Sequence, residues 1–192
     1  QKNIKVYGST KHKKKFKIKY VNIKLSENFI GSQSKQYIDK FIEHEKKDPS
    51  NIIEIHNRPF YLKKLSKGLN KRMYTLFFHN DPLSMEGSKS LPERQFLLQI
   101  CNTIAFNSRW SKNRFLEGLD IKNINSETLK IFFQSASKSK TSIIKKKKNW
   151  ITFVGKLNKA KGYDIFGKSI TEVLDKNPNW RAKIVGDEKR EK

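Results

Sequence analysis

The chain has 192 residues, of which 42 are Lys or Arg and 18 are Asp or Glu, so its formal net charge is +24. Aromatic residues make up 11% of the chain, which is too many for a disordered polypeptide despite the charge. The one cysteine, Cys101, excludes an internal disulfide framework and a cysteine-rich zinc site. The single cysteine makes a reducing, cytoplasmic setting the default expectation. No run of about 18 apolar residues is present, so no membrane span is expected.

The first half of the chain alternates short apolar runs with amphipathic segments. Residues 4–7 predict a short strand, and the basic stretch 11–20 predicts an exposed strand or hairpin, because its second half alternates apolar residues with Lys. The next expected elements are a helix over 34–47, a buried strand over 52–55, a short helix over 61–67 and a buried strand over 74–78.

The second half continues the alternation after a polar loop. The expected elements are a helix from Pro92, a strand over 103–106, a helix capped by Ser108, a strand over 128–133, a linker, a strand over 150–154, a helix from 162 or 163 to 174, and a strand over 180–185. Strands that alternate with helices and carry continuous apolar runs favour an α/β fold, with a parallel sheet covered on both faces. We expect domains at 1–133 and 150–192, joined by a linker at 134–149.

The positive charge alone does not identify a partner. Only seven of the basic residues are Arg, which is the residue that reads base edges, so no specific nucleic-acid partner is predicted. The lysines accompany many Ile and Asn residues, a composition that A/T-rich codons would also produce. The lysine runs 13–15 and 145–148 are interpreted as solvated loops. A phosphate-rich partner and an anionic membrane surface remain open as alternatives.

Polar clusters follow several of the expected strands. In parallel sheets, ligands bind at the carboxyl ends of the strands, so these clusters are the candidate site. The clusters are His56-Asn57-Arg58, His79-Asn80-Asp81, Asn107-Ser108, Gly155-Lys156 and Gly186-Asp187. His79 could contact a sugar hydroxyl or a phosphate, or simply cap a strand end. The four histidines lack the spacing of metal ligands, so no metal site is predicted.

The loop over residues 153–162 carries the most distinctive local pattern. A strand ends in Gly155, Lys156 follows at once, and Lys161-Gly162 precede a helix. Glycine allows close approach of a ligand to the backbone, and two lysines with a helix N-terminus behind them can hold a diphosphate. The alternative is a basic surface turn in a lysine-rich protein.

Together these segments resemble a family 4 glycosyltransferase of the GT-B architecture, over roughly residues 50–190. Four segments carry the resemblance in the family's order: 53–59 (IEIHNRP), 78–82 (FHNDP), 104–112 (IAFNSRWSK) and 151–157 (ITFVGKL) with 161–162 (KG). The last resembles the donor-binding segment and is the most specific. Lys156 stands where Arg is commoner in the family, which keeps the charge but loses the bidentate fork.

The resemblance implies two Rossmann-like domains and transfer of a sugar from a nucleotide-sugar donor to a glycan or lipid-linked acceptor. Gly155, Lys156 and Lys161 would bind the donor diphosphate, and His79 would lie beside the transferred sugar. The cleft residues His56, Asn57, Arg58, Asn80 and Asp81 would face the acceptor. The reaction would retain the anomeric configuration without a metal or other cofactor, in surface polysaccharide synthesis, with peripheral membrane contact left open.

The resemblance also implies a longer protein, because the family's Gly-rich first loop and its Glu-x7-Glu segment are not found. We therefore expect the chain to be an interior fragment that is inactive alone, with 150–192 of low stability. Two other functions stay open: a basic nucleic-acid-binding module, and a non-catalytic nucleotide- or sugar-binding scaffold.

Overall fold

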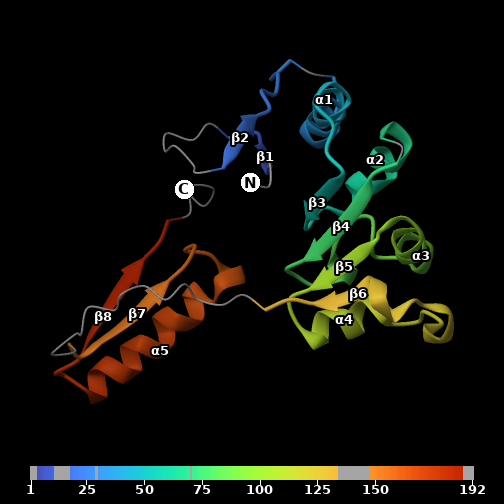
Figure 1. Ribbon diagram of the computed structural model, residues 1–192. Coiled ribbons are helices and arrows are strands. Elements are labelled where there is room, and N and C mark those ends of the chain that lie inside the picture. Colours follow the sequence, from blue (N-terminus) through green and yellow to red (C-terminus); the bar gives the residue numbers. More distant parts are fainter. Residues whose placement is uncertain (1–3, 11–17, 29, 70, 134–147, 188–192) are drawn as a thin grey trace. The chain divides into compact units, whose positions relative to one another are not determined.

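The computed structural model describes residues 4–10, 18–28, 30–69, 71–133 and 148–187 (Figure 1). The chain divides into two compact units, residues 1–135 and 136–192, which are described separately below. The predicted linker at 134–149 lies almost wholly outside the described residues.

The first unit alternates strands and helices in the predicted order. Its elements are β1 (Lys5–Gly8), β2 (Lys19–Asn22), α1 (Gln33–Lys47), β3 (Ile52–His56), α2 (Leu62–Gly68), β4 (Met73–Phe78), α3 (Leu91–Ile100), β5 (Thr103–Phe106), α4 (Arg109–Leu116) and β6 (Leu129–Ile131). Ser108 caps α4 as predicted, since its side chain accepts a hydrogen bond from the Ser111 N–H. Ser90 and Glu93 form a capping box at α3, with Pro92 in the first turn.

Four strands form one parallel sheet in the order β3-β4-β5-β6, which is a Rossmann-like arrangement. β1 and β2 form a separate two-stranded sheet, also parallel. These two strands therefore form no hairpin. The prediction of a strand within residues 11–20 is correct at its carboxyl end, and residues 11–17 lie outside the described part.

Helices cover one face of the four-stranded sheet, so the prediction of cover on both faces is wrong for the described residues. On the covered face, Ile53, Ile55, Leu76 and Phe78 are at most 6% exposed, whereas Ile52 and Met73 on the other face are 53% and 46% exposed. The physical reason is the direction of the crossovers. Each step from β3 to β6 moves the same way along the sheet, and right-handed connections then place α2, α3 and α4 on the same face.

A buried carboxylate joins three segments of the first unit. Glu45 of α1 has no exposed surface and accepts hydrogen bonds from the Ser50 N–H, at 2.9 Å, and from the Tyr7 hydroxyl, at 3.2 Å. Burial and the nearby Glu45 carboxylate raise the pKa of Tyr7 to about 12, so its hydroxyl stays a donor. Tyr7 also packs edge-on against Phe41, with ring centroids 4.8 Å apart. Strand β1 is thereby fixed against α1.

The second unit is small and open. β7 (Trp150–Val154) pairs in parallel with β8 (Arg181–Val185), and α5 (Tyr163–Lys176) connects them. Phe153 packs against Tyr163 and Phe166, with ring centroids 5.8 and 5.2 Å apart. Within residues 148–187 no residue is buried. So small a sheet cannot cover its own apolar surface.

Candidate functional site

Two histidines meet at the carboxyl ends of neighbouring strands. His56 is the last residue of β3, His79 directly follows β4, and His56 Nδ1 lies 2.9 Å from His79 Nε2. One nitrogen donates and the other accepts, according to the tautomers. The two rings stack with centroids 5.2 Å apart, and Phe77 stacks on His56 at 4.6 Å. The strand register produces this pairing, because His56 lies opposite Phe77.

Asparagine side chains hold the backbone of His79 from both sides. Asn57 Oδ1 accepts from the His79 N–H at 2.7 Å, and Asn107 Nδ2 donates to the His79 carbonyl at 2.8 Å. Asn57 has a φ of 54°, a left-handed conformation that asparagine tolerates better than most residues. Asn57 therefore positions His79. The sequence placed Asn107 after a strand but gave no sign of this contact.

The remaining predicted cleft residues have different surroundings. Asp81 accepts from the Leu83 N–H at 3.0 Å, caps the turn Pro82–Ser84, and lies 3.4 Å from Arg114 Nη2. These contacts give Asp81 a structural role at the start of a turn. Asn80 is exposed, and Arg58 Nη1 donates to the Asn57 carbonyl at 2.9 Å.

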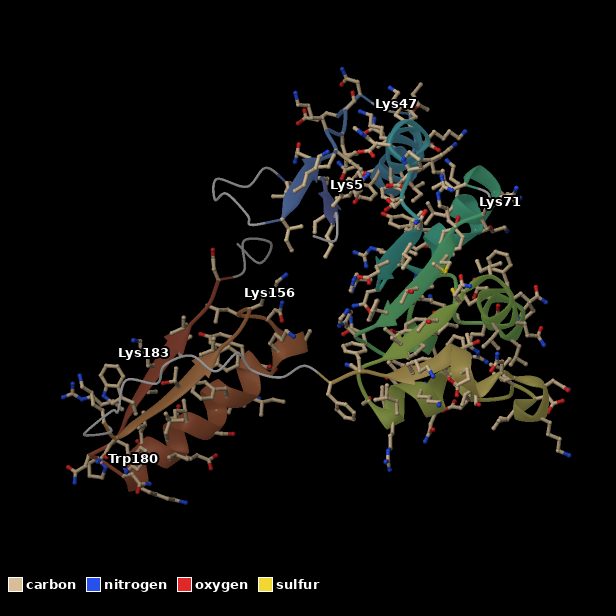
Figure 2. All side chains as sticks on the ribbon, viewed as in Figure 1. Lys5, Lys47, Lys71, Lys156, Trp180 and Lys183 are labelled. Atoms are coloured by element: carbon tan, nitrogen blue, oxygen red, sulfur yellow. The ribbon has the colours of Figure 1, made fainter. Side chains whose placement is uncertain are left out.

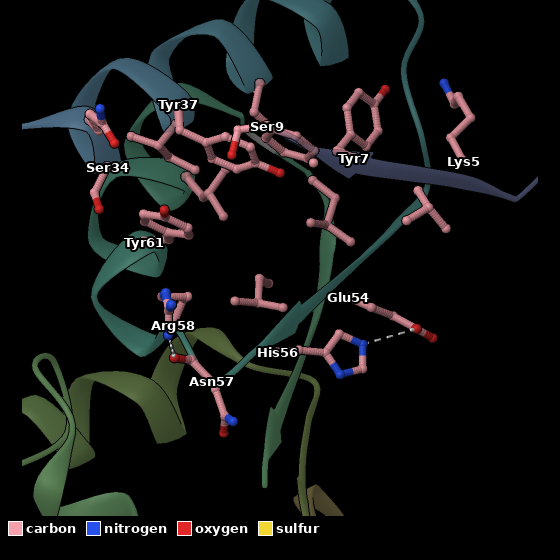
Figure 3. A pocket seen from close by; sticks show the side chains of 18 of the residues that line it. Lys5, Tyr7, Ser9, Ser34, Tyr37, Glu54, His56, Asn57, Arg58 and Tyr61 are labelled. Carbon is pink, nitrogen blue, oxygen red and sulfur yellow. Dashed lines mark hydrogen bonds and ion pairs between the residues drawn. The ribbon is translucent and has the colours of Figure 1, made fainter. Parts of the chain in front are cut away.

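A groove of about 740 Å³ lies between β1, β3 and α1 (Figure 3). His56, Asn57 and Arg58 line one end of it, and Tyr37 and Tyr61 line another part of its wall. Three of the predicted cleft residues thus border a hollow of the size that holds a small ligand.

The environment of His56 favours its neutral form. Burial lowers its pKa from 6.5, the neighbouring His79 lowers it further, and Glu54 opposes the shift. Glu54 Oε2 lies 3.9 Å from His56 Nε2, and both side chains are more than half exposed. A neutral His56 can share a proton with His79 without placing two positive charges side by side.

We expect the stability of the first unit to fall as the pH is lowered through the His56 transition. The folded state lowers the pKa of His56, so the unfolded chain binds more protons below 6.5. The stability that neutral His56 contributes is fully present above its pKa in the unfolded chain. It is lost as the pH falls through the pKa of His56 in the folded chain. Urea unfolding at several pH values from about 5 to about 8 should show a shallower pH dependence for His56→Gln than for the unsubstituted chain. Equal slopes would contradict the expectation.

The second unit presents Gly155, Lys156 and Lys161 at the carboxyl end of β7. Lys156 and Lys161 are both exposed, and Figure 2 shows Lys156 at the opposite end of the strands from Trp180. Asn158 accepts from the Lys161 N–H at 3.2 Å and caps the turn Lys159–Lys161. Gly162 then precedes α5 as its N-cap, with a φ of 70°. The loop between the two lysines is therefore fixed by a side-chain cap and a left-handed glycine.

Gly186 allows the ends of β7 and β8 to approach closely. The Gly155 N–H donates to the Val185 carbonyl at 3.0 Å. A Cβ on Gly186 would lie 1.7 Å from the Gly155 carbonyl oxygen, so only glycine fits there. A Cβ on Gly155 would lie 3.9 Å from the Lys161 Cβ, which places the stem of Lys161 beside Gly155. The sequence marked Gly186 as a residue after a strand, but its role depends on the strand pairing.

The described residues contain no group of three or more potential metal ligands. None of the described helices combines the length and apolar character needed to cross a membrane. No protein-family model matches the sequence, and a search of curated proteins finds no match either.

Proposed function

We propose that the chain carries parts of a glycosyltransferase of the GT-B architecture, which moves a sugar from a nucleotide-sugar donor to a glycan or lipid-linked acceptor. The reaction would be retaining and metal-independent, in the synthesis of a surface polysaccharide or lipopolysaccharide. The single observation that carries the proposal is the loop from Gly155 to Gly162. It presents two exposed lysines and the start of a fourteen-residue helix at the carboxyl end of a parallel strand.

The chemistry of this loop suits a diphosphate. Lys156 and Lys161 have no carboxylate partner among the ion pairs of the described residues, so their charge is available to a ligand. The first N–H groups of α5 and the helix dipole favour a negative group at the same place. As the nucleotide leaves, the two ammonium groups would stabilise the charge that develops on its phosphate.

The histidine pair suits the sugar side of such a reaction. His79 has a backbone held by Asn57 and Asn107, and its ring is fixed by His56 and by an edge contact from Phe132 at 5.3 Å. A fixed imidazole can donate to or accept from a sugar hydroxyl without the cost of ordering its side chain. His79 would therefore orient the transferred sugar.

Binding of UDP, GDP and ADP to the chain, measured by isothermal titration calorimetry, tests the donor-site proposal. Lys156→Gln and Lys161→Gln should each weaken binding of the preferred nucleotide by at least about tenfold, because each removes a charged hydrogen bond. Lys176→Gln, at the far end of α5, removes the same charge and should leave the affinity unchanged. If all three variants lose affinity equally, the proposal fails and only non-specific attraction to a basic protein remains. If no nucleotide binds, the proposed donor site fails as well.

A further inference from the structure

The groove between β1 and β3 has an unpaired strand edge on each side. In the part of the chain that the structure describes, β1 pairs only with β2, and β3 pairs only with β4. Every residue of β1 lines the groove, and so does every residue of β3 except Ile52. Such edges present rows of free N–H and C=O groups, which are templates for a further strand.

The backbone hydrogen bonds identify the groups that face the groove. The Asn57 N–H donates to Phe77 and the Asn51 carbonyl accepts from Met73, so the odd-numbered residues of β3 bond to β4. The N–H and C=O groups of successive residues point to alternate sides of a strand in a parallel sheet. Those of Glu54 and His56 therefore point away from β4. The Gly8 carbonyl accepts from Ile23 of the next segment, so Lys5 and Tyr7 point theirs away from β2.

The two edges have the same orientation. In β3, the residues whose side chains face the helices direct their N–H groups toward β4. In β4, the residues whose side chains face the helices direct theirs toward β5. Tyr7 follows the same relation, because its side chain packs on Phe41 of α1 while its N–H faces the groove. In Figure 3 the chain runs from Lys5 through Tyr7 along β1 in the same sense as it runs from Glu54 to His56 along β3. A strand between them could therefore pair in parallel with both.

The floor of the groove is apolar and is held in place. Its apolar lining comprises Tyr37, Ile38 and Phe41 of α1, Leu65 of α2, and Ile53 and Ile55 of β3. Glu45 and the ion pair between Lys5 Nζ and Asp48 Oδ2, at 3.0 Å, anchor β1 to the end of α1. The wall formed by β1 thus keeps its place although no strand pairing connects it to β3.

We propose that this groove binds one extended peptide segment of about five or six residues, apolar at alternate positions, as a strand parallel to β1 and β3. The bound strand would be continuous with both existing ladders and would unite the two sheets in the order β2-β1-strand-β3-β4-β5-β6. Its side chains on the helix side would cover the apolar floor. An acidic residue at its carboxyl end would lie near Arg58, whose guanidinium is exposed. This inference does not depend on the proposed glycosyltransferase function.

A synthetic six-residue peptide, with valine or isoleucine alternating with threonine and aspartate at its end, tests the proposal. Binding to the chain should be saturable, and NMR hydrogen exchange should slow at the N–H groups of Lys5, Tyr7, Glu54 and His56. A peptide of the same composition with a central N-methylated residue should bind at least about tenfold more weakly, because it lacks a ladder donor.

Two variants of one position provide the matched control. Glu54→Pro removes an N–H that faces the groove at an edge strand, so it should abolish peptide binding while the amides that bond β3 to β4 stay protected. Glu54→Ala removes only the exposed side chain and should bind normally. The proposal is overturned if both peptides bind equally, if neither binds at millimolar concentration, or if protection appears on other edges. Competition by UDP or by a disaccharide at the same amides would instead assign the groove to a small molecule.

Discussion

Replacement of Gly186 with alanine is expected to separate the carboxyl ends of β7 and β8 and to weaken nucleotide binding by at least about tenfold. The added Cβ would lie 1.7 Å from the Gly155 oxygen and 2.8 Å from the Gly155 carbonyl carbon. Both groups belong to the backbone, so no side chain can rotate away to relieve the overlap. The strands must move apart, and Gly155 then loses its hydrogen bond to Val185.

A second glycine of the same unit provides the control. Gly167 lies within α5, and a Cβ added there meets no atom within 4 Å. Gly167→Ala should therefore stabilise the helix by up to about 1 kcal/mol, through the higher helix propensity of alanine. Amide exchange in β7 and β8 measures the structural effect, and UDP titration measures the effect on binding. Unchanged exchange in Gly186→Ala would show that the two loops do not approach as described. Faster exchange with unchanged UDP affinity would leave the geometry intact and refute only the site.

Replacement of Phe106 with alanine is expected to cost about 3–5 kcal/mol of the free energy of unfolding of the first unit. Phe106 has no exposed surface, and its ring lies 5.6 Å from that of Phe78 and 5.4 Å from that of Phe115, centroid to centroid. These three rings join β4, β5 and α4, so the cavity left by alanine cannot close without moving several elements. Since small domains are stable by only about 5–15 kcal/mol, this one change would bring the unit close to unfolding.

Urea unfolding followed by far-UV circular dichroism gives the measurement. Phe133→Ala serves as the matched control because Phe133 is 89% exposed, and its removal should change the free energy of unfolding by less than about 0.5 kcal/mol. Phe106→Leu should fall between the two, since it retains most of the apolar volume. A cost below about 1 kcal/mol for Phe106→Ala would mean that the three rings do not form a tightly packed core.

The kinds and order of the elements could be predicted from the sequence because their signals are local. Apolar runs with sharp polar ends predict β3, β4, β5 and β7, and the position of Ser108 before an amphipathic segment predicts a helix cap. The placement of His56 and His79 at the carboxyl ends of two strands also follows from local information, whereas their contact depends on β3 and β4 being neighbours in the sheet.

The apolar runs could not predict whether helices pack on one face of the sheet or on both. A continuous run suggests two buried faces, but Ile52 is 53% exposed although it belongs to such a run. Which face receives helices depends on the direction in which successive strands are added, and that is a property of the whole topology. The gap between β1 and β3 is hidden for the same reason.

The contacts within the candidate site could not be predicted from the sequence either. Asp81 reads equally well as a ligand-binding residue or as the cap of a proline turn, and its bond to the Leu83 N–H supports the second reading. Asn57 and Asn107 act on His79 from segments far apart in the chain, so no spacing could reveal them. Gly186 differs from other glycines after strands only through its opposite neighbour Gly155.

The sheet face that the described helices of the first unit leave uncovered has a consequence for association between molecules. Exposed apolar side chains and open strand edges would ordinarily draw copies of the chain together. The net charge of +24 opposes this by mutual repulsion, which acts over a distance of only about 8 Å at physiological ionic strength. The abundance of lysine therefore has a physical use that is independent of any ligand. Concentrated salt would screen this repulsion and favour association of the molecules.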